Sequence, residues 1–198
     1  ADGTQAPVMT VPIRAVEVSE TEQPDELVVG LSWYGLGSMV SWPDSLGAFR
    51  TMGLNTISNH AHWIAKPGAA GYDEQWALWD EAREQGFKLL NIDSTFHRIP
   101  NEPETRCQFA DGTIGTKLCP SYRGQYYRAE LERVASQNAK AKPDYIFPDI
   151  ELWGWRGPTD AEKCTRCQAD FAESGCETLA EWQLQKGSEM WVDVVEAI

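Results

Sequence analysis

The stretch Gly86-Phe87-Lys88-Leu89-Leu90-Asn91-Ile92-Asp93 decides the predicted fold class. A glycine that ends a helix leads directly into a short apolar run, and the run closes on a carboxylate. The same join recurs at Gly53-Leu54-Asn55, before an apolar run that ends at His60. Short apolar runs that follow helices through tight glycine turns are typical of buried parallel strands covered by helices.

Strand-like and helix-like segments alternate along the rest of the chain. We predict strands at 27–33, 54–60, 87–93 and 143–151, and helices at 43–52, 73–85 and 122–138. A broken apolar pattern after residue 178 predicts a fourth helix. Alternation of this kind predicts an α/β fold with a parallel sheet.

The number of strands limits the architecture. Only four strands fit the 198 residues, whereas a closed (β/α)8 TIM barrel needs about 250. We therefore predict a flexible segment over 1–26 and a partial TIM-barrel-like catalytic domain over 27–198, made of the first four βα units, with a Cys-rich loop at 156–177. Three explanations stay open: a truncated or processed chain, which we favour, a second half carried by another chain or oligomer partner, and an open, doubly wound sheet.

Charge and composition exclude some partners. The net charge of -13 and the pI near 4.6 argue against nucleic acid and anionic membranes, which require a basic face. No apolar run approaches the ~20 residues that cross a bilayer. The polar start at residues 1–7 suits an N-terminus left after processing, so we expect a secreted or periplasmic protein.

The five cysteines lie in segments that the sequence predicts as loops. Cys107 and Cys119 bracket a turn-rich stretch that a local disulfide bond could close. Cys164, Cys167 and Cys176 could form a metal or redox site, but the three histidines lie far upstream and no fourth ligand is near. Disulfide bonds of an exported protein are therefore favoured over metal, with one cysteine left over. We expect no metal and no cofactor.

Polar and aromatic side chains follow all four predicted strands, where function gathers in parallel α/β folds. Asp149 and Glu151 are two residues apart on the fourth strand, so they are expected to face the same way. Glycosidic-bond cleavage needs one carboxyl that keeps its proton and one that stays ionised. A solvated strand end is the alternative for this pair.

Individual roles follow from these positions. Glu151, beside aromatic rings, is the expected general acid, and Asp149 its partner. Asp93 is expected to be either a further catalytic or sugar-binding carboxylate, or the first turn of a loop. The residues expected to contact substrate are Trp33, Tyr34, Asn59, His60, His62, Trp153 and Trp155. With Asp93, the two histidines could instead bind a metal, although a histidine pair is more often part of a hydrogen-bonded structure.

Over residues 27–155 the chain resembles (β/α)8-barrel glycoside hydrolases. The resemblance rests on the strand-end pattern, the aromatic-rich loops and the run Leu118-Cys119-Pro120-Ser121-Tyr122. The chitinase-type motif D-x-x-D-x-D-x-E is similar at Asp144, Asp149 and Glu151, with Phe147 in place of one acid, and no S-x-G-G is found on the third strand. By this resemblance Glu151 is the general acid and Asp149 orients a substrate amide.

These features together predict a secreted glycoside hydrolase (a glycosidase) that cleaves a polysaccharide or oligosaccharide by carboxylate acid/base chemistry. Two alternatives remain. The first is a non-catalytic carbohydrate-binding protein of the same fold. The second is a metal or redox domain centred on the cysteines at 164–176.

Overall fold

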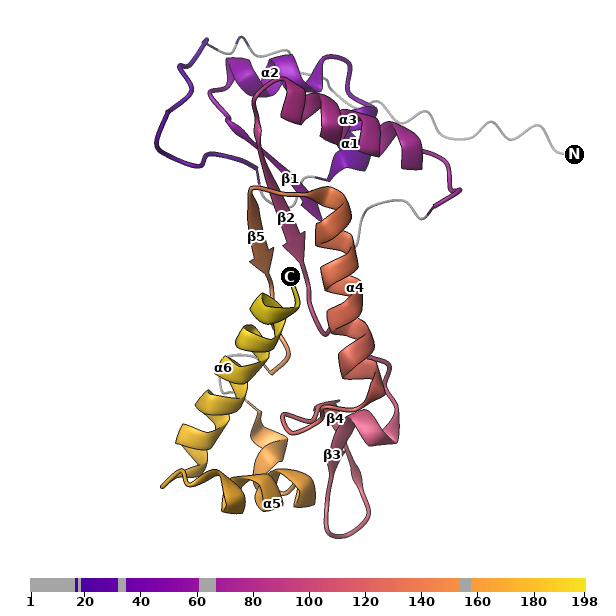
Figure 1. Ribbon diagram of the computed structural model, residues 1–198, viewed down its shortest axis with the longest axis vertical. Coiled ribbons are helices and arrows are strands. Elements are labelled where there is room, and N and C mark those ends of the chain that lie inside the picture. The colour runs from indigo at the N-terminus through magenta and orange to yellow at the C-terminus, as the bar shows by residue number, and fades with distance from the viewer. Residues whose placement is uncertain (1–16, 18, 32–34, 61–66, 154–157) are drawn as a thin grey trace, which may run out of the picture.

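The computed structural model describes residues 17, 19–31, 35–60, 67–153 and 158–198. The fold is mixed α/β, with a three-stranded parallel sheet and a separate two-stranded antiparallel hairpin (Figure 1). The parallel strands are β1 (Thr56–His60), β2 (Lys88–Asp93) and β5 (Tyr145–Pro148), and the hairpin strands are β3 (Arg106–Gln108) and β4 (Ile114–Leu118). The helices are α1 (Leu36–Val40), α2 (Ser45–Thr51), α3 (Tyr72–Glu84), α4 (Gln125–Ala141), α5 (Thr165–Ser174) and α6 (Leu179–Ala197), with short 3₁₀ turns η1 (Pro103–Thr105) and η2 (Thr159–Glu162).

The parallel strands lie side by side in the order in which they occur in the sequence, β1-β2-β5. Ile57 of β1 is paired with Leu89 of β2, and Asp93 at the end of β2 is paired with Pro148 of β5. Before β1, Gly30 forms a single parallel bridge to Thr56. All four segments predicted as strands therefore take part in one parallel arrangement, and the predicted parallel α/β class is confirmed.

The first predicted strand is much weaker than expected. Leu27 and Val28 are 67% and 50% exposed, so the prediction of a buried strand over 27–33 is wrong for its described part. The segment over 1–26 is predicted as flexible, but its described part is held to the rest of the fold by a backbone hydrogen bond. The backbone N–H of Thr21 donates to the Thr51 carbonyl at 2.9 Å, at the end of α2.

Both long helices that follow β1 and β2 pack on the same face of the sheet. Leu89, Asn91 and Asp93 alternate onto one face of β2. On that face Leu89 lies in a core cluster with Trp79 of α3. The Asn91 side-chain amide donates to the Asn138 side-chain oxygen of α4 at 2.7 Å. Helices α3 and α4 thus cover the same face of the sheet.

The opposite face is partly open on β5. Tyr145 and Phe147, which alternate onto this face, are 41% and 53% exposed. Within the described residues the strands do not close into a barrel, so the predicted TIM-barrel architecture goes further than the fold that is seen. Nor is any helix in these residues long and apolar enough to cross a membrane.

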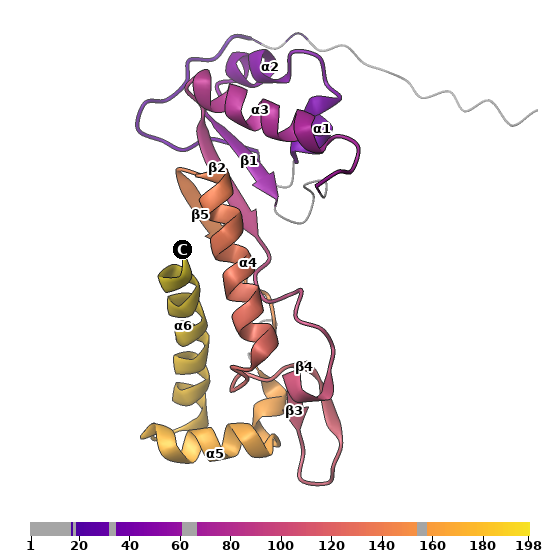
Figure 2. The same cartoon turned by 45° about the vertical axis from the view of Figure 1, so that its right-hand side comes forward.

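Helix α4 runs from the sheet to a second core at the other end of the molecule, where the hairpin, α5 and α6 meet (Figure 2). This core contains the buried residues Cys107, Leu118, Cys119, Tyr127, Cys164, Cys167, Trp182 and Val194. Two predictions are corrected here. The segment around Cys107 and Cys119, predicted as a loop, contains the hairpin, and the Cys-rich loop predicted at 156–177 contains η2 and α5. The predicted fourth helix is continuous over the 19 residues of α6.

Candidate functional site

Asp93 lies on the helix-covered face of the sheet and is 1% exposed. Its two carboxylate oxygens accept hydrogen bonds from the Arg133 guanidinium, at 2.7 and 2.9 Å. Arg133 is also held by Glu130, at 2.8 Å. Burial alone would lower the pKa of Arg133, but the hydrogen bonds to Glu130 and Asp93 outweigh it and raise that pKa. Asp93 is therefore part of a buried ion pair between the sheet and α4, and we do not retain it as a catalytic carboxylate.

His60 and Asp149 lie on the other face of the sheet. His60 is paired with Ile92, whose side chain alternates away from Asp93. The Asp149 backbone N–H donates to the Asp93 carbonyl at 2.7 Å, which extends the strand pairing one residue beyond β5. Asp149 therefore continues the alternation of Tyr145 and Phe147. Burial lowers the pKa of His60, while the charges of Asp149 and Asp93 act to raise it.

Glu151 comes two residues later and is exposed. Its backbone N–H donates to His97 Nε2 at 3.3 Å. Its side chain lines an open hollow of about 270 Å³ that Arg106 and Lys117 also line. Among the described residues, Phe96 is the one aromatic ring of Phe, Tyr or Trp in this lining, while Trp33, Tyr34 and Trp155 lie outside them.

Of the residues predicted to contact substrate, the structure describes Asn59, His60 and Trp153, and these three lie in different surroundings. Asn59 is buried on the helix-covered face with Asn91, which turns it away from His60. Trp153 is half-buried, and its indole N–H donates to the Leu118 carbonyl at 2.9 Å, against the second core. The predicted substrate contacts at Trp33, Tyr34, His62 and Trp155 lie outside the described residues.

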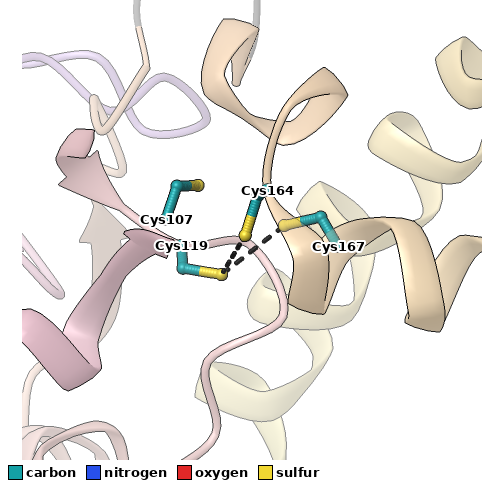
Figure 3. A group of neighbouring side chains, drawn as sticks. All are labelled: Cys107, Cys119, Cys164 and Cys167. Carbon is teal, nitrogen blue, oxygen red and sulfur yellow. Dashed lines mark hydrogen bonds between the residues drawn. The ribbon is translucent and has the colours of Figure 1, made fainter. Parts of the chain in front are cut away.

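Four of the five cysteines converge on one point in the second core (Figure 3). All four side chains are buried, and their sulfur atoms all lie within 4.8 Å of one another. The sulfur of Cys119 lies 3.5 Å from that of Cys167 and 3.8 Å from that of Cys164, and Cys107 completes the group. Figure 3 shows the four thiols pointing toward one another from two sides.

The hairpin and α5 each supply two of these cysteines. Cys107 is on β3, and Cys119 directly follows β4. Cys164 is the N-cap residue of α5, and Cys167 lies in its first turn. An antiparallel bridge between Phe109 and Cys164 brings the two elements together.

All five cysteines are free thiols in the structure, so the predicted disulfide between Cys107 and Cys119 is not formed. A disulfide bond would place two sulfurs about 2.05 Å apart. Hydrogen bonds from the thiols of Cys107 and Cys167 lower the pKa of Cys119 below its ordinary value. Cys176, which the sequence grouped with Cys164 and Cys167, lies outside the cluster and contacts Gln185 at 3.0 Å.

Sequence reasoning missed this cluster because its halves are far apart along the chain. Cys119 and Cys164 are separated by 45 residues, and only the fold brings them together. The available signal was the Cys-x-x-Cys spacing at 164 and 167, together with a second cysteine pair on either side of a turn.

Comparison of the chain with protein-family models, curated proteins and solved structures found no match. The class that the fold defines is therefore an α/β protein with a parallel sheet. Two groups of side chains bear on function: those at the strand ends, with His60, Asp149 and Glu151, and the four clustered cysteines.

Proposed function

We propose that this chain is the first half of a singly wound (β/α)8 barrel and that it hydrolyses glycosidic bonds. The observation that carries the proposal is that α3 and α4 cover the same face of the sheet. A doubly wound sheet has helices on both faces, whereas a barrel has them only on the outside. The face that carries His60 and Asp149 then corresponds to the interior of the barrel.

Strand order supports the same architecture. The strands lie side by side in sequence order: the segment around Gly30, then β1, β2 and β5. In a doubly wound sheet, by contrast, the direction of the strand order reverses at the switch point. The outer strands also expose apolar side chains, at Leu27 and Val28 on one edge and at Tyr145 and Phe147 on the other. Further strands, from the same protein or from a second chain, would cover these edges.

The chemistry assigns one step to each carboxyl group. Glu151 donates its proton to the glycosidic oxygen as the bond from that oxygen to the anomeric carbon breaks. Asp149, in its ionised form, stabilises the positive charge that develops on the sugar or attacks it. Water then bonds to the anomeric carbon and gives a proton back to Glu151, which restores both carboxyl groups. Arg106 and Lys117 line the hollow beside Glu151 and would attract an acidic group such as a uronate on the polysaccharide.

The test is the release of reducing ends from a panel of neutral and uronate-containing polysaccharides. Glu151→Gln should lower turnover at least about 100-fold, because general acid catalysis contributes about 10² to 10⁴. Asp149→Asn should also lower turnover. The matched control is Glu84→Gln, an exposed carboxylate at the end of α3, which should leave turnover unchanged.

Unchanged turnover in Glu151→Gln would contradict the catalytic role. The exposure of Glu151 favours one second candidate, a carbohydrate-binding protein without catalysis. In that case the wild-type chain would bind glycans on an array, no glycan would be cleaved, and Glu151→Gln would bind as the wild type does.

A further inference from the structure

We propose that Cys107, Cys119, Cys164 and Cys167 bind one Zn²⁺ as a closed, structural four-thiolate site. Zinc in such sites is tetrahedral, with zinc–sulfur distances of about 2.3 Å. This geometry places neighbouring sulfurs about 3.8 Å apart. The sulfur–sulfur distances of 3.5 and 3.8 Å from Cys119 already have this value within a few tenths of an ångström.

Burial indicates a structural role for the metal. The four cysteines are 0% or 1% exposed in the described part of the chain, which leaves them well shielded from solvent. Catalytic zinc sites keep one position open, and structural sites use all four for protein ligands. A tetrahedral set of four sulfurs selects zinc or iron–sulfur chemistry over calcium and magnesium, which prefer oxygen.

The surroundings suit negatively charged sulfur. Cys164 caps the N-terminus of α5 and Cys167 lies in its first turn, where the helix dipole is positive and stabilises thiolates. On the hairpin side, Cys119 directly follows β4, and its backbone N–H donates to the Thr105 carbonyl at 2.9 Å, which fixes its position. Contacts of this kind orient metal ligands.

The metal would fix one wall of the hollow that contains Glu151. Thr116, Lys117 and Leu118 of β4 line that hollow, and the Leu118 carbonyl holds the Trp153 indole. Zinc would link β4 to α5 by binding both Cys119 and Cys164, which are 45 residues apart in sequence. Because metal binding to a site that forms only on folding adds to folding free energy, zinc should stabilise this half of the molecule.

The first experiment is native mass spectrometry of the full chain purified without chelator, together with thiol labelling. We expect one zinc per chain, and labelling at Cys176 alone. After addition of a zinc chelator, the four clustered cysteines should become reactive, and re-added zinc should protect them. Disulfide-linked peptides from the clustered cysteines, iron in place of zinc, or labelling that does not depend on the chelator would overturn the proposal.

Variants give a second readout. Cys107→Ser and Cys164→Ser should lose stoichiometric zinc, and Cys176→Ser, the matched control, should keep it. If a cluster variant fails to fold, cobalt substitution of the wild type replaces it. Cobalt should give the absorption bands of tetrahedral thiolate coordination, and a spectrum without sulfur-to-cobalt bands would overturn the assignment. None of these outcomes depends on whether the chain hydrolyses glycans.

Discussion

At the scale of single residues, the face on which a strand side chain lies decides its role. Asp93 closes an apolar run in the sequence, which is where catalytic carboxylates are found in parallel folds. Its position could be predicted, but its direction could not, because β1 and β2 carry buried residues on both faces. Only the pairing with Arg133 shows that Asp93 faces α4.

The first prediction concerns this buried pair. Asp93→Asn removes one of the two carboxylates that pair with Arg133 and leaves Glu130 as the other, so we expect it to destabilise the fold by about 1.5–3 kcal/mol. Urea unfolding followed by circular dichroism measures the change. Asp80→Asn, which breaks an exposed ion pair with Arg83, is the control and should cost less than about 1 kcal/mol. An unchanged unfolding midpoint in Asp93→Asn would contradict the structural role.

The second prediction concerns pH. Burial lowers the pKa of His60 from its ordinary value of 6.5. Between that value and the lower folded pKa, the unfolded chain binds a proton that the folded chain does not. Stability should therefore fall as pH decreases below about 6.5.

In urea unfolding measured at a series of pH values below about 6.5, the stability of His60→Gln should depend less on pH than that of the wild type. His97→Gln is the control variant, because the His97 imidazole instead accepts a hydrogen bond from the Glu151 backbone N–H. Parallel pH profiles for wild type and His60→Gln would contradict the prediction.

At the scale of secondary structure, helices that are followed by a glycine could be predicted from the sequence. The short strand β3 and helix α5 could not. Gly53 and Gly86 have φ of +78° and +85°, the left-handed conformation that favours glycine after a helix. Helices α2 and α3 accordingly match their predicted positions to within a few residues, and so does α4, whose C-cap is Lys142 rather than a glycine. The three-residue strand β3 has no apolar periodicity, and α5 begins at cysteines that resemble a loop.

The third prediction concerns the start of α6. The Thr178 hydroxyl accepts from the Glu181 backbone N–H at 3.2 Å, and the Glu181 carboxylate accepts from the Thr178 N–H at 3.1 Å. Thr178→Ala removes half of this capping box and should cost about 1 kcal/mol of unfolding free energy. Ser188→Ala, in the interior of the same helix, should be neutral or slightly stabilising. Equal effects of the two variants would contradict a specific capping contribution.

At the scale of the whole molecule, the strand order could not be predicted, because a barrel and an open, doubly wound sheet both fit the sequence. The parallel class could be predicted, because apolar runs alternate with helices along the chain. The antiparallel hairpin and the four-cysteine cluster could not, because they depend on contacts between segments that are far apart in sequence. Cys119 and Cys164 illustrate this, since their sulfur atoms lie 3.8 Å apart although 45 residues separate them in sequence.

The fourth prediction concerns the open edge of the sheet. Exposed apolar side chains on an edge strand promote pairing with another copy. We expect the 198-residue chain to self-associate as concentration rises, and Phe147→Lys to shift it toward the monomer. Sedimentation velocity over a concentration series measures this. Val195→Lys, on the exposed face of α6, is the control for a general gain in solubility. A wild type that is monomeric throughout would contradict the prediction.

X-ray absorption at the zinc K edge tests the four-cysteine centre most directly. The full chain, purified without chelator, should show a first shell of four sulfurs at about 2.3 Å from zinc, with no nitrogen or oxygen ligand. Cys176→Ser should give the same spectrum. Zinc surrounded by nitrogen and oxygen, or a chain that holds no zinc while its four clustered cysteines are oxidised, would contradict the centre.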